Sequence, residues 1–256
     1  MIGLKYGDFI LQNPPYIWVH QTDVYSPPES SVQADTLAQA DGALVVQQRY
    51  KPKTYSISGV IRRDDTVALE QALDTFKAAM AVKNQAFDVD YAGDVRRYLS
   101  YATTVTIAKT GRNTSAGFTV AFICPDGVGW SVDSTSFVDP TGITSSNFSI
   151  AVATAGTYKV EPQITATFNT VTDGTGKTVS ISNGTSLRGI SVTRDWITGD
   201  VLEIDSLKMT VYVNNMPVDF SGQFPKWDVG ASELSYLDDF SSRDVTLSAS
   251  YTRRWL

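Results

Sequence analysis

The stretch 199-GDVLEIDSLKMTVYVNN-215 decides the fold class of the C-terminal half of the chain. Apolar and polar residues alternate along it, and the alternation changes phase at Asp205-Ser206. Because side chains on a strand point to opposite faces in turn, this change predicts a turn between two strands. Asn214-Asn215 predicts a second tight turn, since Asn tolerates positive φ. We therefore expect a β-meander with one buried face and one solvent face.

The polar residues of this stretch raise a second interpretation, an active site built from acidic, basic, hydroxyl and amide groups. They occupy the positions where a half-buried sheet needs polar side chains, which favours the structural interpretation. The apolar face of the predicted meander consists of Leu202, Ile204, Leu207, Met209, Val211 and Val213.

Composition restricts the functional classes. The chain has 256 residues, of which 42% are hydrophobic and 19% charged, as in a globular protein with a substantial core. Abundant Thr, Ser, Val and Tyr predict a β-rich fold. A net charge of −6 argues against specific nucleic-acid binding, which needs a basic patch. With one cysteine and no signal-peptide pattern, we expect folding in a reducing cytoplasm without membrane insertion.

One helix is predicted in the N-terminal half, over 66-TVALEQALDTFKAAM-80. Asp64 and Asp65 precede it, and carboxylates there cap the first N–H groups and suit the helix dipole. Its apolar residues recur at helical spacing and predict one buried stripe. The stripe consists of Leu69, Leu73, Phe76 and Met80, extended by Val67 and Ala79.

The rest of the N-terminal half is predicted as strands and irregular chain. Residues 1–31 are broken by two proline pairs and are predicted to be irregular, as a segment that crosses a surface or wraps a neighbour. Residues 43–62 contain two strand-like runs around Lys51-Pro52-Lys53, which predicts a hairpin. The glycines and proline of 125-PDGVGW-130 mark a domain boundary.

The predicted fold is therefore α+β followed by all-β. Residues 1–130 form a β-rich domain with one helix, and residues 131–256 form a β-sandwich with short strands and frequent turns.

Sequence motifs for catalysis, phosphate binding or metal binding are weak in this chain. The run 174-GTGKT-178 lacks the first glycine of a phosphate-binding loop and continues as a strand, which favours a hairpin turn. Asp88, Asp90 and Asp94 resemble a calcium loop, but the fifth and closing ligand positions are apolar, which favours a solvated edge. No metal site, cofactor or catalytic residue is predicted.

The sequence contains two arrangements of possible nucleophiles or acid–base groups. Cys124 ends an apolar strand run, as inert buried cysteines do, and His20 is the only histidine. The carboxylate pairs Glu203/Asp205, Asp238-Asp239 and Asp64-Asp65 are too local to predict a hydrolytic cleft. A hydrolase with an unrecognised carboxylate pair stays open as an alternative.

Three aromatic residues are candidate contacts for carbohydrate or for a protein partner. They are Trp196, Tyr212 and Trp227. An exposed ring could stack on the apolar face of a pyranose, whereas burial in the core or in an interface is the commoner fate of such rings.

Across its whole length the sequence resembles the distal tail protein (Dit) family of long-tailed siphophages. The N-terminal half is similar to the ring-forming domain of that family. The segments that carry this similarity are 43-ALVVQQRYKPKTYSISGVIRR-63, the helix around 66–80 and 118-FTVAFICPD-126.

The C-terminal half is similar to the galectin-like sandwich of the same family. The segments that carry this are 156-GTYKVEPQITATF-168, 199–215, 222-GQFPKWDVGASEL-234 and 248-SASYTRRWL-256. In the family, a Pro-x-Leu-x-Pro-Gly-x-Asn pattern follows the Phe of the third of these segments. Here Gly230 is kept, but the second proline and the asparagine are not, so the chain diverges from the family pattern.

The resemblance implies a non-enzymatic role at the virion tail tip after assembly in the host bacterial cytoplasm. It implies a homo-hexameric ring that joins the major tail tube protein to the tail-tip hub protein. Outward galectin-like domains would dock a receptor-binding protein or host saccharide. The acidic balance suits a DNA conduit, because a negative bore repels phosphates. The alternatives are a carbohydrate-binding protein and another baseplate adaptor with a galectin-like sandwich.

Overall fold

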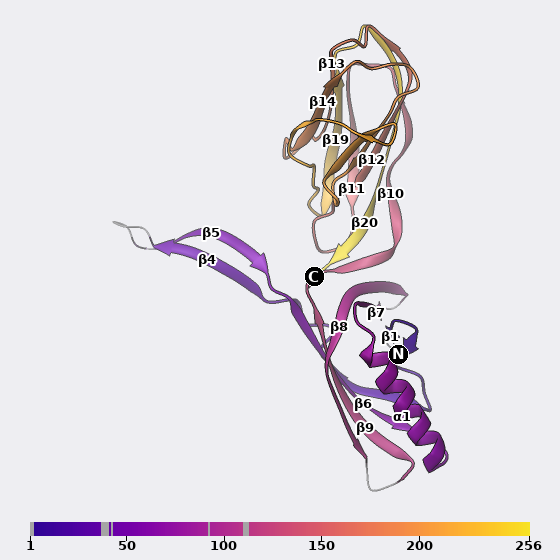
Figure 1. Cartoon of the computed structure of the whole chain (residues 1–256). Coiled ribbons are helices and arrows are strands. Elements are labelled where there is room, and N and C mark those ends of the chain that lie inside the picture. The colour runs from indigo at the N-terminus through magenta and orange to yellow at the C-terminus, as the bar shows by residue number, and fades with distance from the viewer. Residues whose placement is uncertain (1–2, 37–40, 42, 92, 110–112) are drawn as a thin grey trace. The chain divides into compact units, whose positions relative to one another are not determined.

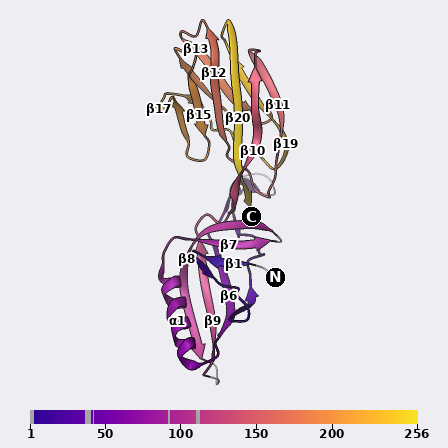
Figure 2. The same cartoon turned by 90° about the vertical axis from the view of Figure 1, so that its right-hand side faces the viewer.

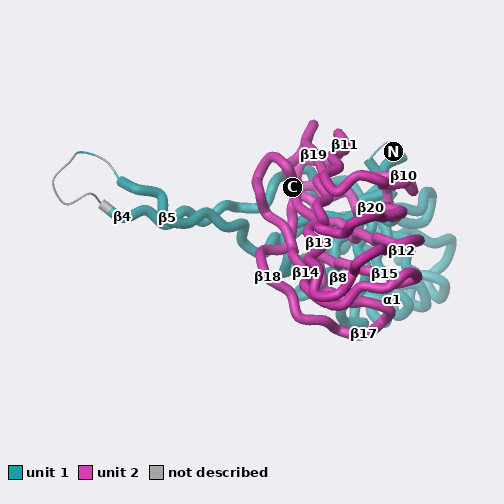
Figure 3. The backbone as a smooth tube through the Cα atoms, turned by 90° about the horizontal axis from the view of Figure 1, so that it is seen from above, with its two compact units in different colours: residues 1–132, 256 teal, residues 133–255 magenta. Residues whose placement is uncertain are grey.

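The computed structural model describes residues 3–36, 41, 43–91, 93–109 and 113–256. The chain separates into two compact units (Figure 3). Unit 1 comprises residues 1–132 and Leu256, and unit 2 comprises residues 133–255. Each unit has its own cluster of buried apolar side chains. Among the described residues, no helix combines the length and the apolar character needed to cross a bilayer.

Unit 1 is a β-rich unit with one helix among its described residues. Its elements are β1 (Leu4–Tyr6), β2 (Phe9–Ile10), β3 (Ile17–Thr22), β4 (Ser30–Thr36), β5 (Ala43–Tyr50), β6 (Lys53–Arg62), α1 (Thr66–Ala81), β7 (Gln85–Tyr91), β8 (Asp94–Lys109), β9 (Ser115–Cys124) and the start of β10 (Gly129–Ile143).

Strand β8 belongs to two sheet regions of unit 1. Its first half pairs with β7, which continues through β1 to β2, and its second half pairs with β9, which continues through β6 to β3. A register shift between Ala102 and Thr104 marks an irregularity within the second half. The unit's aromatic core includes Tyr55, Phe87 and Phe122.

The helix has the predicted cap and the predicted buried stripe. The Asp65 carboxylate accepts a 2.8 Å hydrogen bond from the Ala68 N–H, which satisfies one free donor at the N-terminus. Leu69, Leu73, Phe76 and Met80 are buried, as predicted. Val67 is exposed and does not extend the stripe. Figure 2 shows α1 lying along the strands of unit 1, and the Phe76 ring contacts the Phe118 ring of β9.

Two predictions for the N-terminal half are wrong. Residues 1–31 are not irregular throughout, because β1 and β3 pair with β7 and β6. Leu4 and Tyr6 are buried there and hold the segment in the core. The predicted hairpin over 43–62 is also wrong, because β5 pairs with β4, whereas β6 pairs with β3 and β9.

Unit 2 consists of two sheets that enclose one core (Figure 1). The first has the order β17-β16-β15-β12-β20-β10, and the second β11-β19-β13-β14-β18. The elements are β11 (Asn147–Thr154), β12 (Gln163–Thr172), β13 (Lys177–Asn183), β14 (Gly189–Arg194), β15 (Val201–Asp205), β16 (Thr210–Val213), β17 (Met216–Pro217), β18 (Ser221–Gly222), β19 (Gly230–Asp238) and β20 (Ser242–Trp255).

The predicted meander is present as β15, β16 and β17, with one difference. Asn214 and Asn215 have φ of 52° and 62° and form the second turn, as predicted. The first turn is longer than predicted, because residues 206–209 all lie outside the strands. Leu207 and Met209 are therefore 45% and 59% exposed instead of facing the core.

The glycine-rich run 174–178 contains the turn between β12 and β13 and the first two residues of β13, in line with the predicted hairpin turn. A Cβ on Gly174 would lie 2.1 Å from the carbonyl oxygen of Trp196, so this glycine permits a close backbone approach. The N–H of Trp196 donates to the Gly174 carbonyl at 2.9 Å. The turn thus serves packing, and no helix N-terminus follows it.

Candidate functional site

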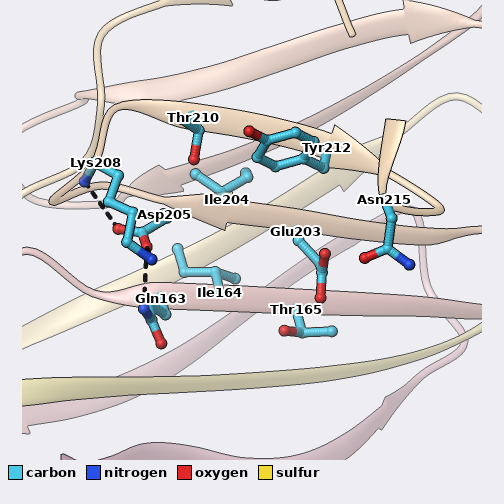
Figure 4. A pocket seen from close by; sticks show the side chains of 10 residues that line it. All are labelled: Gln163, Ile164, Thr165, Glu203, Ile204, Asp205, Lys208, Thr210, Tyr212 and Asn215. Atoms are coloured by element: carbon cyan, nitrogen blue, oxygen red, sulfur yellow. Dashed lines mark hydrogen bonds and ion pairs between the residues drawn. The ribbon is translucent and has the colours of Figure 1, made fainter. Parts of the chain in front are cut away.

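The outer face of the first sheet of unit 2 carries a surface hollow lined mainly by polar side chains. Strands β12, β15 and β16 form its floor, and their alternate residues Ile164, Ile204 and Val211 point inward and are buried. The hollow has a volume of about 380 Å³, within the usual range of about 300–1,000 Å³ for ligand pockets. The lining residues are Gln163, Ile164, Thr165, Glu203, Ile204, Asp205, Lys208, Thr210, Tyr212 and Asn215 (Figure 4).

Strand register places the polar lining in two rows. Thr165, Glu203 and Tyr212 are paired in one row across the three strands. Gln163, Asp205 and Thr210 are paired in the next row. Glu203 and Asp205 belong to the opening stretch, but their partners on β12 lie about forty residues earlier in the sequence.

At one end of the hollow, the Asp205 carboxylate has hydrogen-bond and ion-pair partners within the protein. The carboxylate accepts from the Leu207 and Lys208 N–H groups at 3.1 and 2.9 Å, and from the Gln163 amide at 3.0 Å. The Lys208 ammonium lies 3.1 Å away. Partial burial acts to raise the pKa of Asp205, but these hydrogen bonds and the Lys208 charge outweigh it and lower the pKa below its ordinary value.

The other end of the hollow has polar groups that the protein does not use. Within the described residues, neither the Glu203 carboxylate nor the Tyr212 hydroxyl has a hydrogen-bond or ion-pair partner. Glu203 is exposed and Tyr212 is half-buried, so both are accessible from solvent. The Thr165 and Asn215 side chains adjoin them (Figure 4). This end can therefore accept and donate hydrogen bonds to a bound molecule.

The two tryptophans predicted as candidate contacts do not line this hollow. Trp196 and Trp227 are 3% and 0% exposed and belong to the core of unit 2. Their indole N–H groups donate to the carbonyls of Lys177 and Glu233 at 3.0 and 3.2 Å. A ring buried on both faces offers no surface for stacking, so the expectation of contact through them is corrected. Of the three predicted residues, Tyr212 alone lines the hollow.

A nucleophilic pair of Cys124 and His20 finds no support in the geometry. Cys124 is buried, and burial raises the pKa of its thiol to about 12, which disfavours the nucleophilic thiolate. His20 lies on β3 and is exposed. Among the described residues there is no group of three or more His, Cys, Asp or Glu side chains that could hold a metal ion.

The aspartates of the run 88–94 are used within the protein. Asp88 binds the Arg97 guanidinium at 2.8 Å through each carboxylate oxygen. Asp90 accepts from the Gly93 N–H at 2.6 Å. Residue 92, the fifth position of the calcium-loop pattern, lies outside the described residues. The run is a strand end stabilised by an ion pair.

The second candidate surface is the β4–β5 hairpin of unit 1, called the hairpin arm below (residues 30–36 and 43–50). It forms a separate two-stranded sheet and extends away from the rest of its unit (Figure 3). Its exposed residues include apolar side chains that monomeric proteins usually bury. They are Val32, Leu44, Val45 and Val46.

Known proteins resemble this chain in sequence over one part and in fold over its full length. Residues 155–255 match the family model described as siphovirus-type tail component, C-terminal domain. The crystal structure of the phage SPP1 Dit protein is described as a paradigm of the hub adsorption apparatus in phages that infect Gram-positive bacteria. It aligns with 100% of both chains, at a TM-score of 0.72 and 13% identity.

A more distant structural similarity is too weak to support a conclusion on fold or function. A chain of the phage P2 baseplate in its activated conformation with Ca aligns over 99% of this chain and 98% of that chain. The TM-score is 0.46 and the identity is 9%. The sequence has no significant match among curated proteins. Residues 155–255 thus match the siphovirus-type tail component model, and the full chain shares the fold of the SPP1 Dit protein.

Proposed function

We propose that copies of this chain form a hexameric ring at the virion tail tip. The ring connects the major tail tube protein to the tail-tip hub protein and anchors peripheral receptor-binding components. Unit 1 is the ring-forming domain, and unit 2 is a galectin-like sandwich that carries the outward contacts. The role is non-enzymatic, and the ring assembles in the host bacterial cytoplasm.

The hairpin arm is the observation that supports self-assembly best. Leu44 and Val46 of β5 are 61% and 54% exposed. Antiparallel strands that expose apolar side chains and unpaired edges favour association with another chain. An arm that reaches out from its own unit can contact a neighbouring copy in a closed ring.

The root of the arm, where β4 and β5 join the rest of unit 1 (residues 24–29 and 51–53), is held in place by two lysines. The Lys53 ammonium donates to the carbonyls of Val24 and Ser26, which precede β4. Lys51 and Glu29 form an ion pair of 3.0 Å across the root, and their backbones are joined by a 2.8 Å hydrogen bond. A fixed root gives the arm a defined direction, which a ring contact requires.

Light scattering and negative-stain microscopy of the full chain test this proposal. We expect a mass of six copies and rings with a central hole, either alone or after mixing with the tube and hub proteins. A chain that stays monomeric in the presence of both partners would refute the ring. A different stoichiometry at the baseplate would favour a peripheral adaptor.

A further inference from the structure

We propose that the β11 edge of unit 2 pairs with the β11 edge of a second copy of this chain, so that two five-stranded sheets become one sheet of ten strands. The inference goes beyond the proposed ring and does not rest on it, because every residue involved belongs to unit 2. A closed ring joins each copy to two neighbours through unlike surfaces, whereas this contact uses the same surface on both copies and closes on a pair.

The four sheet edges of unit 2 are protected unequally. Strands β17 and β18 are each two residues long, and β17 contains Pro217. Strand β10 carries Asp133, Asp139 and Pro140 along its length. Short strands, charges and prolines are the means by which sheet edges avoid pairing. Strand β11 ends the five-stranded sheet with eight residues, none of them charged and none a proline, so it is the edge suited to pairing.

The backbone groups along this edge are available for pairing. Strand β11 pairs with β19 over all eight residues without a register shift, so no bulge bends it. Just before β11, the Asp238 N–H donates to the Ser146 carbonyl at 3.0 Å. Hydrogen-bonded pairs alternate along an antiparallel ladder, so the even-numbered residues of β11 bond to β19. The N–H and C=O groups of Ser149, Ala151 and Ala153 therefore point to the open edge, where no described residue bonds to them.

The inward side chains of β11 match those of an identical strand. Phe148 and Ile150 are half-buried and pack at the margin of the unit 2 core, and Val152 is buried. An antiparallel pair centred on Ile150 places Phe148 of each copy opposite Val152 of the second copy, so every inward pair is apolar. A pair centred one residue later would place Phe148 opposite Thr154. The centre at Ile150 therefore sets the register, and it removes the remaining exposed surface of these apolar side chains from water.

The outward side chains allow two copies to approach without repulsion. The same register places Ser149 of each copy opposite Ala151 of the second copy, and both residues are small, exposed and uncharged. Like charges directly opposite each other destabilise a strand pair, and β11 contributes none. A partner recognised through its charge would find no complement on this strand, which favours the second copy.

The contact is small. One strand pair buries less area than a stable dimer requires, so we expect a dissociation constant on the order of 10⁻⁴ M. Such a contact is empty in dilute solution and fills where copies are held close together, since tethered sites reach effective concentrations in the millimolar range.

Sedimentation equilibrium of the full-length chain, from about 10 µM to about 1 mM, tests the proposal. The chain carries Leu44→Glu/Val46→Glu, which removes the proposed ring contact of the arm and leaves β11 intact. We expect a reversible equilibrium between one and two copies. Adding Ser149→Lys/Ala151→Lys places lysine opposite lysine twice and should weaken pairing by about tenfold or more. Adding Ser149→Lys/Ala151→Glu instead places opposite charges together and should preserve or strengthen it.

The matched control is Ser221→Lys. Ser221 is an exposed serine of β18, at the other edge of the same sheet, so the substitution adds the same charge to an edge that does not pair. Thermal unfolding verifies that each variant is folded. Three results would overturn the proposal: a single copy at every concentration, equal pairing by the two Ser149/Ala151 variants, or an equal loss with Ser221→Lys. Ring assembly is measured on the chain without these substitutions, so the two proposals can fail separately.

Discussion

The hairpin arm and the outer face of the β12–β15–β16 sheet are built from the same kind of antiparallel strands but present opposite chemistry. The arm exposes Leu44 and Val46, whereas the sheet face exposes Glu203 and Tyr212 above a buried layer. Side chains that face solvent on a stable sheet are expected to be polar. The sheet face follows this rule and the arm breaks it, which is why we propose that another protein chain completes the arm.

The two surfaces also differ in what supports them. Behind Glu203, the side chains of Ile204 and Leu202 lie in the core of unit 2. The arm has no comparable layer among its described residues, and its root is fixed by Lys53 and Lys51. The sheet face should therefore be stable in an isolated chain, and the arm should gain order on assembly.

The largest expected difference is in the free energy of unfolding, between substitutions of Ile204 and Glu203, which are neighbours on β15 and point to opposite faces. Ile204→Ala should reduce the free energy of unfolding of unit 2 by about 2–5 kcal/mol, because it leaves a cavity in a packed core. Glu203→Ala should change it by about 0.5 kcal/mol or less, because the side chain is exposed and unpaired.

Urea unfolding followed by tryptophan fluorescence measures both values. Equal costs for the two substitutions would mean that the outer face is as important to folding as the core, and the comparison would fail.

A smaller effect is expected at the root of the arm. Burial lowers the pKa of Lys53 to about 8 in the folded state, against an ordinary value of 10.5. Between these two pH values the unfolded chain binds more protons than the folded chain, so the stability of unit 1 should rise with pH through that window. Lys53→Met should lose this rise.

The measurement is the free energy of unfolding at pH 7.5 and pH 10 for wild type and Lys53→Met. Lys51→Met is the control, because its ammonium is exposed at the same root. An identical pH dependence in wild type and Lys53→Met would show that Lys53 is not desolvated.

Local pattern predicted α1 and the meander well, because both depend on neighbours in sequence. The stripe from Leu69 to Met80 and the turn at Asn214-Asn215 are such local features. The arm was missed because Lys51-Pro52-Lys53 has the composition of a hairpin turn, and turn composition does not reveal which strands pair. β5 pairs with β4, which precedes it, and not with β6, which follows it, and residues next to the turn do not determine this pairing.

The candidate site was predictable only in part, for the same reason. Tyr212 and Glu203 could be assigned to a solvent face from their alternation with apolar residues. Their pairing with Thr165 depends on the register between β12 and β15, which the sequence does not contain. The tryptophans were ambiguous because a large ring suits a core and a sugar platform equally well, and burial decides between them.

The smallest effect is expected at Asp205. Its lowered pKa means that its ionised form stabilises unit 2 above the ordinary aspartate value of 3.8, and that this contribution is lost as pH falls through the folded-state pKa. Asp205→Asn should flatten the acid side of the stability curve slightly. Urea midpoints at pH 5 and pH 3 measure the difference, and a steeper curve for Asp205→Asn would contradict the assignment.

The most direct test of the account is the assembly state of two charge-matched arm variants. Leu44→Glu/Val46→Glu places two charges on exposed apolar positions of the arm, and Gln33→Glu/Gln48→Glu places two on exposed polar positions of the same arm. Light scattering, with the tube and hub proteins present, should show six copies for the second variant and a single folded copy for the first. Rings formed equally by both variants would contradict the claim that the arm joins neighbouring copies.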